Sequence, residues 1–158
     1  MSRDWARLEL GDAATIWRSA QPRFLSQVVG AHFETICRDY AIMADPELFG
    51  GLPAEVGAGV VADPVNHKQI QVDVAVLAPA EHGQPRKLLS LGEAKWDRIM
   101  DQRYVERLRR ARDLLTAKGF DTRDTVLACY SGAGFHPDLT GDKPSDVRLI
   151  GLNELYAS

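Results

Sequence analysis

Residues 70–96, IQVDVAVLAPAEHGQPRKLLSLGEAKW, contain two apolar runs joined by a polar loop. In the first run, residues 70–78, aliphatic side chains occupy every second position from Ile70 to Val76, and a period of two is typical of a β-strand. The second run, residues 87–96, is mostly apolar up to its last few positions, as expected for a buried strand. Because the intervening loop is rich in proline and glycine, we expect the two strands to form a hairpin.

The segments on either side of this hairpin extend the pattern into an α/β protein. Apolar side chains recur at helical spacing in residues 24–43 and, more clearly, in residues 101–120, where Gly119 is a stop signal. The expected elements are a helix at 24–43, a strand at 55–62, the two hairpin strands, a helix at 101–120, a strand at 125–131, a long loop and a strand at 147–152. This order predicts an α/β sandwich around a mixed sheet.

Length and composition indicate one domain of ordinary type. The 158 residues are 45% hydrophobic and 26% charged, which allows a sizeable core. We assign residues 1–24 to a lead-in segment, with a short helix at about 13–19 that stops near Pro22, and residues 25–158 to the domain. The sequence has no run of 18 apolar residues and no signal-peptide pattern, so we expect no membrane segment and a cytoplasmic protein.

Charge and cysteine usage exclude some classes of function. A formal net charge of −3 argues against a protein that coats nucleic acid through overall positive charge. It leaves room for a local basic patch, since attraction to phosphate depends on how charge is distributed. Cys37 and Cys129 lack metal-ligand spacing and are expected to be free thiols, and the four histidines show no zinc-ligand spacing.

Two charged residues, Glu93 and Lys95, end the second hairpin strand. On an extended strand they share one face about 6–7 Å apart, and burying such groups is costly unless they are paired or bound to something. Asp73 lies on the face of the first strand opposite the aliphatic residues, and strand pairing would bring it beside Glu93. Two close carboxylates repel unless a cation neutralises them, and Mg²⁺ commonly uses one or two carboxylates together with substrate phosphates. With Lys95 to stabilise charge on phosphate, and Glu34 on the preceding helix as a further acid, the set suits metal-assisted phosphodiester hydrolysis.

This grouping resembles the PD-(D/E)XK nuclease superfamily, in which an aspartate precedes a Glu-x-Lys motif. By that resemblance, Asp73, Glu93 and the backbone carbonyl of Ala94 bind Mg²⁺ or Mn²⁺. Lys95 would be the catalytic lysine and Glu34 the acid on the helix. The implied substrate is DNA.

A closer resemblance spans about residues 25–155. The stretches VGAHFETICRDY, QVDVAV, LGEAKW and YSGAGF are similar to the nuclease-like C-terminal domain, a domain of unknown function, of archaeal-type AAA ATPases. The resemblance implies a restriction-endonuclease-like three-layer sandwich, with a central mixed sheet in the order αβββαβ plus a further strand, flanked by helices. It also implies an ATPase domain or partner. VGAGVVAD stands where a Gly-Arg-Trp-Trp-like stretch is expected, and no P-loop is present, so the chain is a stand-alone relative or part of a longer protein.

Several of these residues have simpler interpretations. Glu93 and Lys95 would lie at a solvated strand end with a cross-strand ion pair, and Glu34 would face solvent or pair with Arg38 four residues later. Trp96 would stack on a base or, as we favour, pack against the sheet. The predicted helix at 101–120 carries a row of arginines that would contact DNA phosphates or form local ion pairs with Glu106 and Asp113; these arginines are Arg103, Arg107 and Arg110.

Two main functions follow. The first is a metal-dependent nuclease-like domain that hydrolyses DNA, as the effector part of an ATPase or as a stand-alone relative. The second is a catalytically inactive adaptor that keeps the fold to bind an ATPase partner or nucleic acid. A third, an enzyme acting on small phosphate esters, would need a closed pocket. Convergence of Asp73, Glu93 and Lys95 within reach of one ion at an open surface would favour the first function, whereas an Asp73 that points to the opposite sheet face from Glu93 would favour the adaptor. The oligomeric state stays open.

Overall fold

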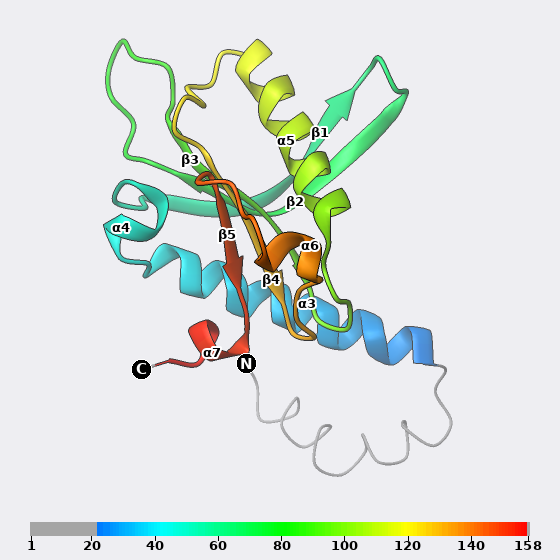
Figure 1. The fold of residues 1–158 in the computed structure, drawn as a ribbon. Helices are drawn as coiled ribbons and strands as arrows, with labels where there is room; N and C mark the ends of the chain where they lie inside the picture. The colour runs from blue at the N-terminus through cyan, green and yellow to red at the C-terminus, as the bar shows by residue number, and fades with distance from the viewer. Residues whose placement is uncertain (1–21, 158) are drawn as a thin grey trace.

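Five strands form one sheet in the order β1-β2-β3-β4-β5 in the computed structural model, which describes residues 22–157 (Figure 1). The strands are β1 (Glu55–Asp63), β2 (Lys68–Leu77), β3 (Leu88–Lys95), β4 (Val126–Ser131) and β5 (Val147–Ile150). The pairs β1–β2 and β2–β3 are antiparallel, whereas β3–β4 and β4–β5 are parallel. The mixed sheet and the predicted hairpin are therefore confirmed.

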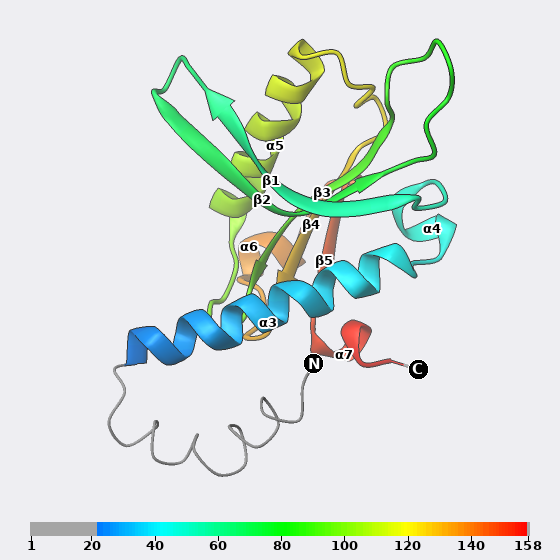
Figure 2. The ribbon, with the colours of Figure 1, turned by 180° about the vertical axis from the view of Figure 1, so that it is seen from behind.

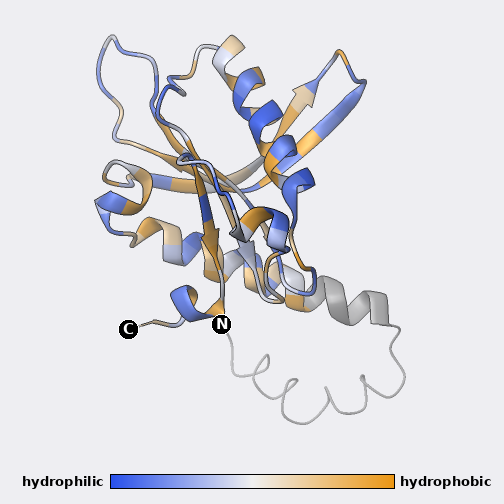
Figure 3. Cartoon of the chain, in the orientation of Figure 1, coloured by the Kyte–Doolittle hydropathy of each residue, from blue (hydrophilic) through white to orange (hydrophobic). Residues whose placement is uncertain are grey.

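Two long helices cover the opposite faces of this sheet (Figures 1 and 2). The helix α3 (Pro22–Ile42) packs on one core cluster, which includes Phe33 and Cys37, and α5 (Gln102–Ala117) packs on the other. Much of α5 is hydrophilic on its outer side (Figure 3), and its fully buried residues lie along one stripe. Within residues 22–157, no helix is both long and apolar enough to cross a membrane.

The remaining helices are short and lie in connections expected to be irregular. They are α4 (Pro46–Phe49), α6 (Pro137–Thr140) and α7 (Leu152–Leu155). The expected short helix at 13–19 lies outside the described residues. The helix α3 begins at Pro22, a position that suits proline because the missing N–H of the first helical turn has no partner to lose.

The pairing of β1 with β2 contains an irregularity near the middle of both strands. Gly57 is opposite Ala75, but Gly59 is opposite Val72, so β2 advances three residues while β1 advances two. This is the pattern of a β-bulge, in which one strand carries an extra residue and bends. The bulge lies in β2 between Val72 and Ala75.

The bulge changes which residues of β2 share a face. Ile70 and Val72 pack in the core cluster beside α5, whereas Val74 and Val76 pack in the cluster beside α3. The prediction that all four share one face is therefore wrong, because one extra residue moves every following side chain to the other side of the sheet. Asp73 lies at the position where the alternation changes.

The strands β2 and β3 separate at this same position. Their last paired residues are Val74 and Gly92, and Asp73 and Glu93 are the first residues beyond that pair. From there β2 continues with β1 alone and β3 continues with β4 alone, so the β1–β2 hairpin leaves the sheet (Figures 1 and 2). We call this opening between Asp73 and Glu93 the fork.

Candidate functional site

Asp73 lies in the fork and is 4% exposed. Its Oδ2 accepts a hydrogen bond from the backbone N–H of Ala94 at 2.9 Å, and its Oδ1 accepts one from Gln71 at 3.3 Å. The side chain thus satisfies a β3 donor that has no strand partner once the strands have separated. Arg38 of α3 donates to the backbone carbonyl of Asp73 at 3.0 Å and holds the strand against the helix.

Glu34 of α3 meets Asp73 from the side of that helix. Partial burial and a hydrogen bond with Asp73 raise the pKa of Glu34 to about 7, while the charges of Arg38 and Lys95 oppose the rise. A carboxyl group that is partly buried and in contact with a second carboxyl group ionises less easily, so Glu34 keeps its proton to a higher pH than a free glutamate. The position of Glu34 matches the prediction that it adds an acid to the set. Arg38, the alternative partner of Glu34, hydrogen-bonds the Asp73 backbone and Thr35.

Glu93 is also 4% exposed and turns toward α5. Its Oε2 is 3.2 Å from Nη2 of Arg107, which is 46% exposed. Burial raises the pKa of the Glu93 carboxyl and the charge of Asp73 adds to this effect, while Arg107 and Lys95 lower it. The simpler interpretation, a solvated strand end with a cross-strand ion pair, is wrong for Glu93, because its carboxylate is buried and pairs with Arg107 of α5.

Lys95 links the two halves of the fork through its charge. It lowers the pKa of Glu34 on the α3 side and the pKa of Glu93 on the α5 side. Asp73 also acts on both glutamates, in the opposite direction. The structure therefore places Glu34 and Asp73 together on the α3 side of the fork and Glu93 on its α5 side, where it pairs with Arg107. Comparisons of the chain with models of protein families, with curated proteins and with solved structures give no match.

The donor atoms at the fork suit a hard divalent cation. The N–H of Ala94 points to Asp73, and because the N–H and C=O of one strand residue point the same way, its carbonyl also faces the fork. Within residues 22–157 no three His, Cys, Asp or Glu side chains form a metal-binding group. Two carboxylates, from Asp73 and Glu93, with one carbonyl are nevertheless a set that Mg²⁺ accepts, since it fills its other positions with water and phosphate oxygens.

The loop after β3 is held beside the fork by the SGAGF segment. Oγ of Ser131 donates to the backbone carbonyl of Arg98 at 2.8 Å and accepts from the N–H groups of Ala133 and Gly134. A Cβ on Gly132 would lie 2.5 Å from the ring of Trp96, so only glycine allows this approach. The segment was recognised in the sequence. Its role in holding the loop after β3 was not predicted, because Ser131 and Arg98 are far apart in the chain.

Trp96 was expected to pack against the sheet, but its ring contacts a helix. Its ring lies 5.5 Å from that of Phe33 on α3, measured between centroids, and the residue remains 38% exposed.

Each of the three predicted arginines forms an ion pair with an acidic residue that lies before the start of α5 or on another element. Arg103 pairs with Asp101 at 2.9 Å, Arg107 with Glu93, and Arg110 with Asp63 of β1 at 3.0 Å. These three arginines have closer partners than Glu106 and Asp113, and Asp113 instead forms a local ion pair with Arg112 at 3.6 Å. The pairing of Arg110 spans 47 positions and has no signal in local spacing.

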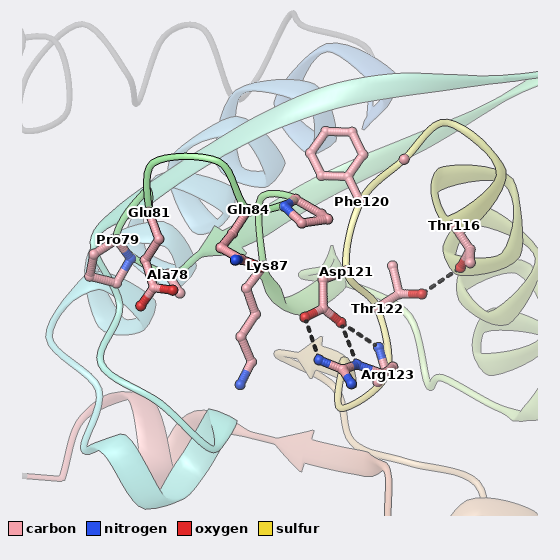
Figure 4. A pocket seen from close by; sticks show the side chains of 12 residues that line it. Ala78, Pro79, Glu81, Gln84, Lys87, Thr116, Phe120, Asp121, Thr122 and Arg123 are labelled. Carbon is pink, nitrogen blue, oxygen red and sulfur yellow. Dashed lines mark hydrogen bonds and ion pairs between the residues drawn. The ribbon is translucent and has the colours of Figure 1, made fainter.

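A separate hollow of about 720 Å³ lies at the opposite end of β2 and β3 (Figure 4). It is bounded by the loop at 78–87 and by the connection from α5 to β4. Figure 4 shows the ion pair between Asp121 and Arg123 beside the side chain of Lys87, and the two charged groups of that pair are 3.2 Å apart. None of the residues selected from the sequence lines this hollow.

Proposed function

We propose that the fork is the active site of a metal-dependent nuclease-like domain that hydrolyses DNA phosphodiester bonds. The observation that carries the proposal is the position of Asp73 and Glu93 as the first residues beyond the last β2–β3 pair, with Glu34 hydrogen-bonded to Asp73 and Lys95 two residues after Glu93. Burial and mutual repulsion raise the pKa values of both glutamates, which is the condition that a bound cation relieves.

The finer description of the fold belongs to the same proposal. We infer a restriction-endonuclease-like sandwich of the PD-(D/E)XK type. The order of α3, three antiparallel strands, α5 and two further parallel strands supports it, as does the position of the acidic residues at the separation of β2 and β3. An ATPase domain or partner follows from the resemblance of the sequence alone.

In this proposal each side chain has a separate task. Asp73, Glu93 and the Ala94 carbonyl would hold Mg²⁺ or Mn²⁺, which on binding activates water and stabilises negative charge on phosphate. Lys95 would stabilise charge that develops on the phosphoryl oxygens during attack. Glu34, with a pKa of about 7, would accept a proton from the attacking water, since a base works best when its pKa is near the working pH.

The inactive adaptor remains the second candidate, and one feature of the fork favours it. Asp73 accepts hydrogen bonds from Ala94 and Gln71, and Glu93 is paired with Arg107, so both carboxylates have partners within the protein. An adaptor would keep these contacts for stability and bind an ATPase or nucleic acid elsewhere. It would have no need of Lys95.

DNA cleavage separates the two candidates. Single-stranded, duplex and branched DNA are incubated with the protein in Mg²⁺, in Mn²⁺ and in EDTA. We expect cleavage only with metal, and loss of that cleavage in Lys95→Ala. The matched control is Lys118→Ala, which removes an exposed lysine after the end of α5 and should cleave as the wild type does. Equal rates for the wild type and Lys95→Ala would contradict the proposal.

A further inference from the structure

A second hollow, of about 520 Å³, lies between the end of the β1–β2 hairpin and α5. It borders the fork, because Arg107 lines the hollow and also contacts Glu93. Half of its ten lining residues are cationic, although the whole chain has a net charge of −3. These cations are Lys68, Arg98, Arg103, Arg107 and Arg110. A concentration of positive charge in a hollow attracts phosphate groups.

One wall of the hollow is tied to the other by a buried ion pair. Asp63 at the end of β1 accepts hydrogen bonds from Nε and Nη2 of Arg110 at 3.2 and 3.0 Å, and from Nδ2 of Asn66 at 2.8 Å. The Asp63 side chain is fully buried, and Arg110 holds the pKa of that carboxyl well below its usual range. Arg110 therefore fixes the hairpin to α5 and maintains the shape of the hollow.

Three of the cations remain available for a ligand. Within the described chain, the side chains of Lys68 and Arg98 form no ion pair or hydrogen bond. Arg107 lies over the ring of Tyr104 at 5.3 Å and is nearly half exposed, with one guanidinium nitrogen on Glu93. Arg107 thus stands between the hollow and the fork.

We propose that this hollow binds a phosphate of a nucleic-acid strand through Lys68, Arg98 and Arg107, and that Arg107 exchanges Glu93 for this phosphate when Glu93 binds a divalent cation. The proposal rests on the proposed function. Buried Glu93 requires a positive partner, which is Arg107 in the metal-free protein. A cation at the fork replaces that partner and leaves the guanidinium to the hollow, so metal and strand strengthen each other's binding.

The coupling is measured by fluorescence anisotropy of a labelled single-stranded oligonucleotide in Ca²⁺ and in EDTA. A gel confirms that the oligonucleotide stays intact. In the wild type we expect binding to be about fivefold tighter or more with Ca²⁺, the lower end of usual coupling between sites. Arg107→Gln should lose this gain while still binding Ca²⁺ in calorimetry.

The matched control is Arg109→Gln, which removes one charge from the same helix. Arg109 pairs with Asp146 and does not line the hollow, so this variant should keep the gain. If Arg107→Gln keeps the wild-type gain, or if Arg109→Gln loses as much, the exchange of Arg107 is wrong.

The hollow itself is tested in EDTA, where no metal is involved. A plot of log affinity against log salt concentration has a negative slope. Each of Lys68→Gln and Arg98→Gln should make that slope less steep by about 0.7, the value for one phosphate contact on a single strand. Unchanged slopes would overturn the phosphate site. If the wild type does not bind Ca²⁺, the proposed metal site is wrong, and so is the exchange of Arg107 between Glu93 and phosphate. The salt dependence in EDTA would still test phosphate binding in the hollow.

Discussion

Replacement of Asp73 separates its structural role from its proposed role in metal binding. In Asp73→Ala the buried N–H of Ala94 loses an acceptor at 2.9 Å, and an unsatisfied buried donor costs about 1–3 kcal/mol. In Asp73→Asn the carboxamide oxygen still accepts from Ala94, while the NH₂ group replaces Oδ1, loses the long bond from Gln71 and is free to donate to Glu34. The asparagine also removes a charge that raises the pKa values of Glu34 and Glu93. We therefore expect its stability to equal or exceed that of the wild type at pH 8.

The assay is urea unfolding in EDTA at pH 8, followed by circular dichroism. With an m-value of about 1–3 kcal/mol/M, the alanine variant should unfold at a midpoint lower by about 1 M. The asparagine variant should unfold at or above the wild-type midpoint. An asparagine variant destabilised as much as the alanine variant would refute this reasoning, because the negative charge and not the acceptor would then support the fork.

Three further predictions concern Glu34, Arg107 and Gly132. The pKa of Glu34 is raised from 4.5 to about 7, so its stabilising contribution is complete below pH 4.5 and is lost as the pH rises to about 7. In Glu34→Gln the urea midpoint should therefore change less with pH between 4.5 and 7 than it does in the wild type. Arg107→Met leaves Glu93 buried without its partner and should lower the free energy of unfolding by about 1–2 kcal/mol at pH 8. The loss is smaller than for a fully buried pair because Arg107 is nearly half exposed. An unchanged urea midpoint would contradict this prediction. Gly132→Ala places a methyl group against Trp96 and should lower stability by about 1–3 kcal/mol in the same assay, whereas the exposed Ala133→Ser should have no effect.

Periodicity in the sequence was sufficient to predict the main elements of the fold. The hairpin of β2 and β3, the helix α5 and the two last strands follow from apolar spacing and turn residues. The bulge in β2 was missed because Ile70 to Val76 keep an unbroken alternation through it. The one available signal was the pair Gly57 and Gly59 in β1, since glycine inside a strand often marks a bulge.

The residues of the candidate site could be predicted from the sequence, but their contacts could not. Asp73, Glu93 and Lys95 could be selected because charged residues in apolar strands are costly unless they have a use. Their partners could not, because the bonds from Arg107 to Glu93 and from Arg110 to Asp63 join residues distant in the chain. Lys68 and Arg98 were missed for the same reason, since only the fold places them in one hollow.

The most direct test of the metal site is a calorimetric titration of Mn²⁺ into the wild type, Asp73→Asn and Glu93→Gln at pH 8. The control is Glu81→Gln, an exposed carboxylate in the loop at the other end of β2 and β3. We predict that the wild type and the control bind Mn²⁺ alike, and that each fork variant binds about tenfold more weakly or worse, as expected when a metal site loses one charged ligand. Equal binding by all four proteins, or no binding by the wild type, would contradict a metal site at the fork and favour the adaptor.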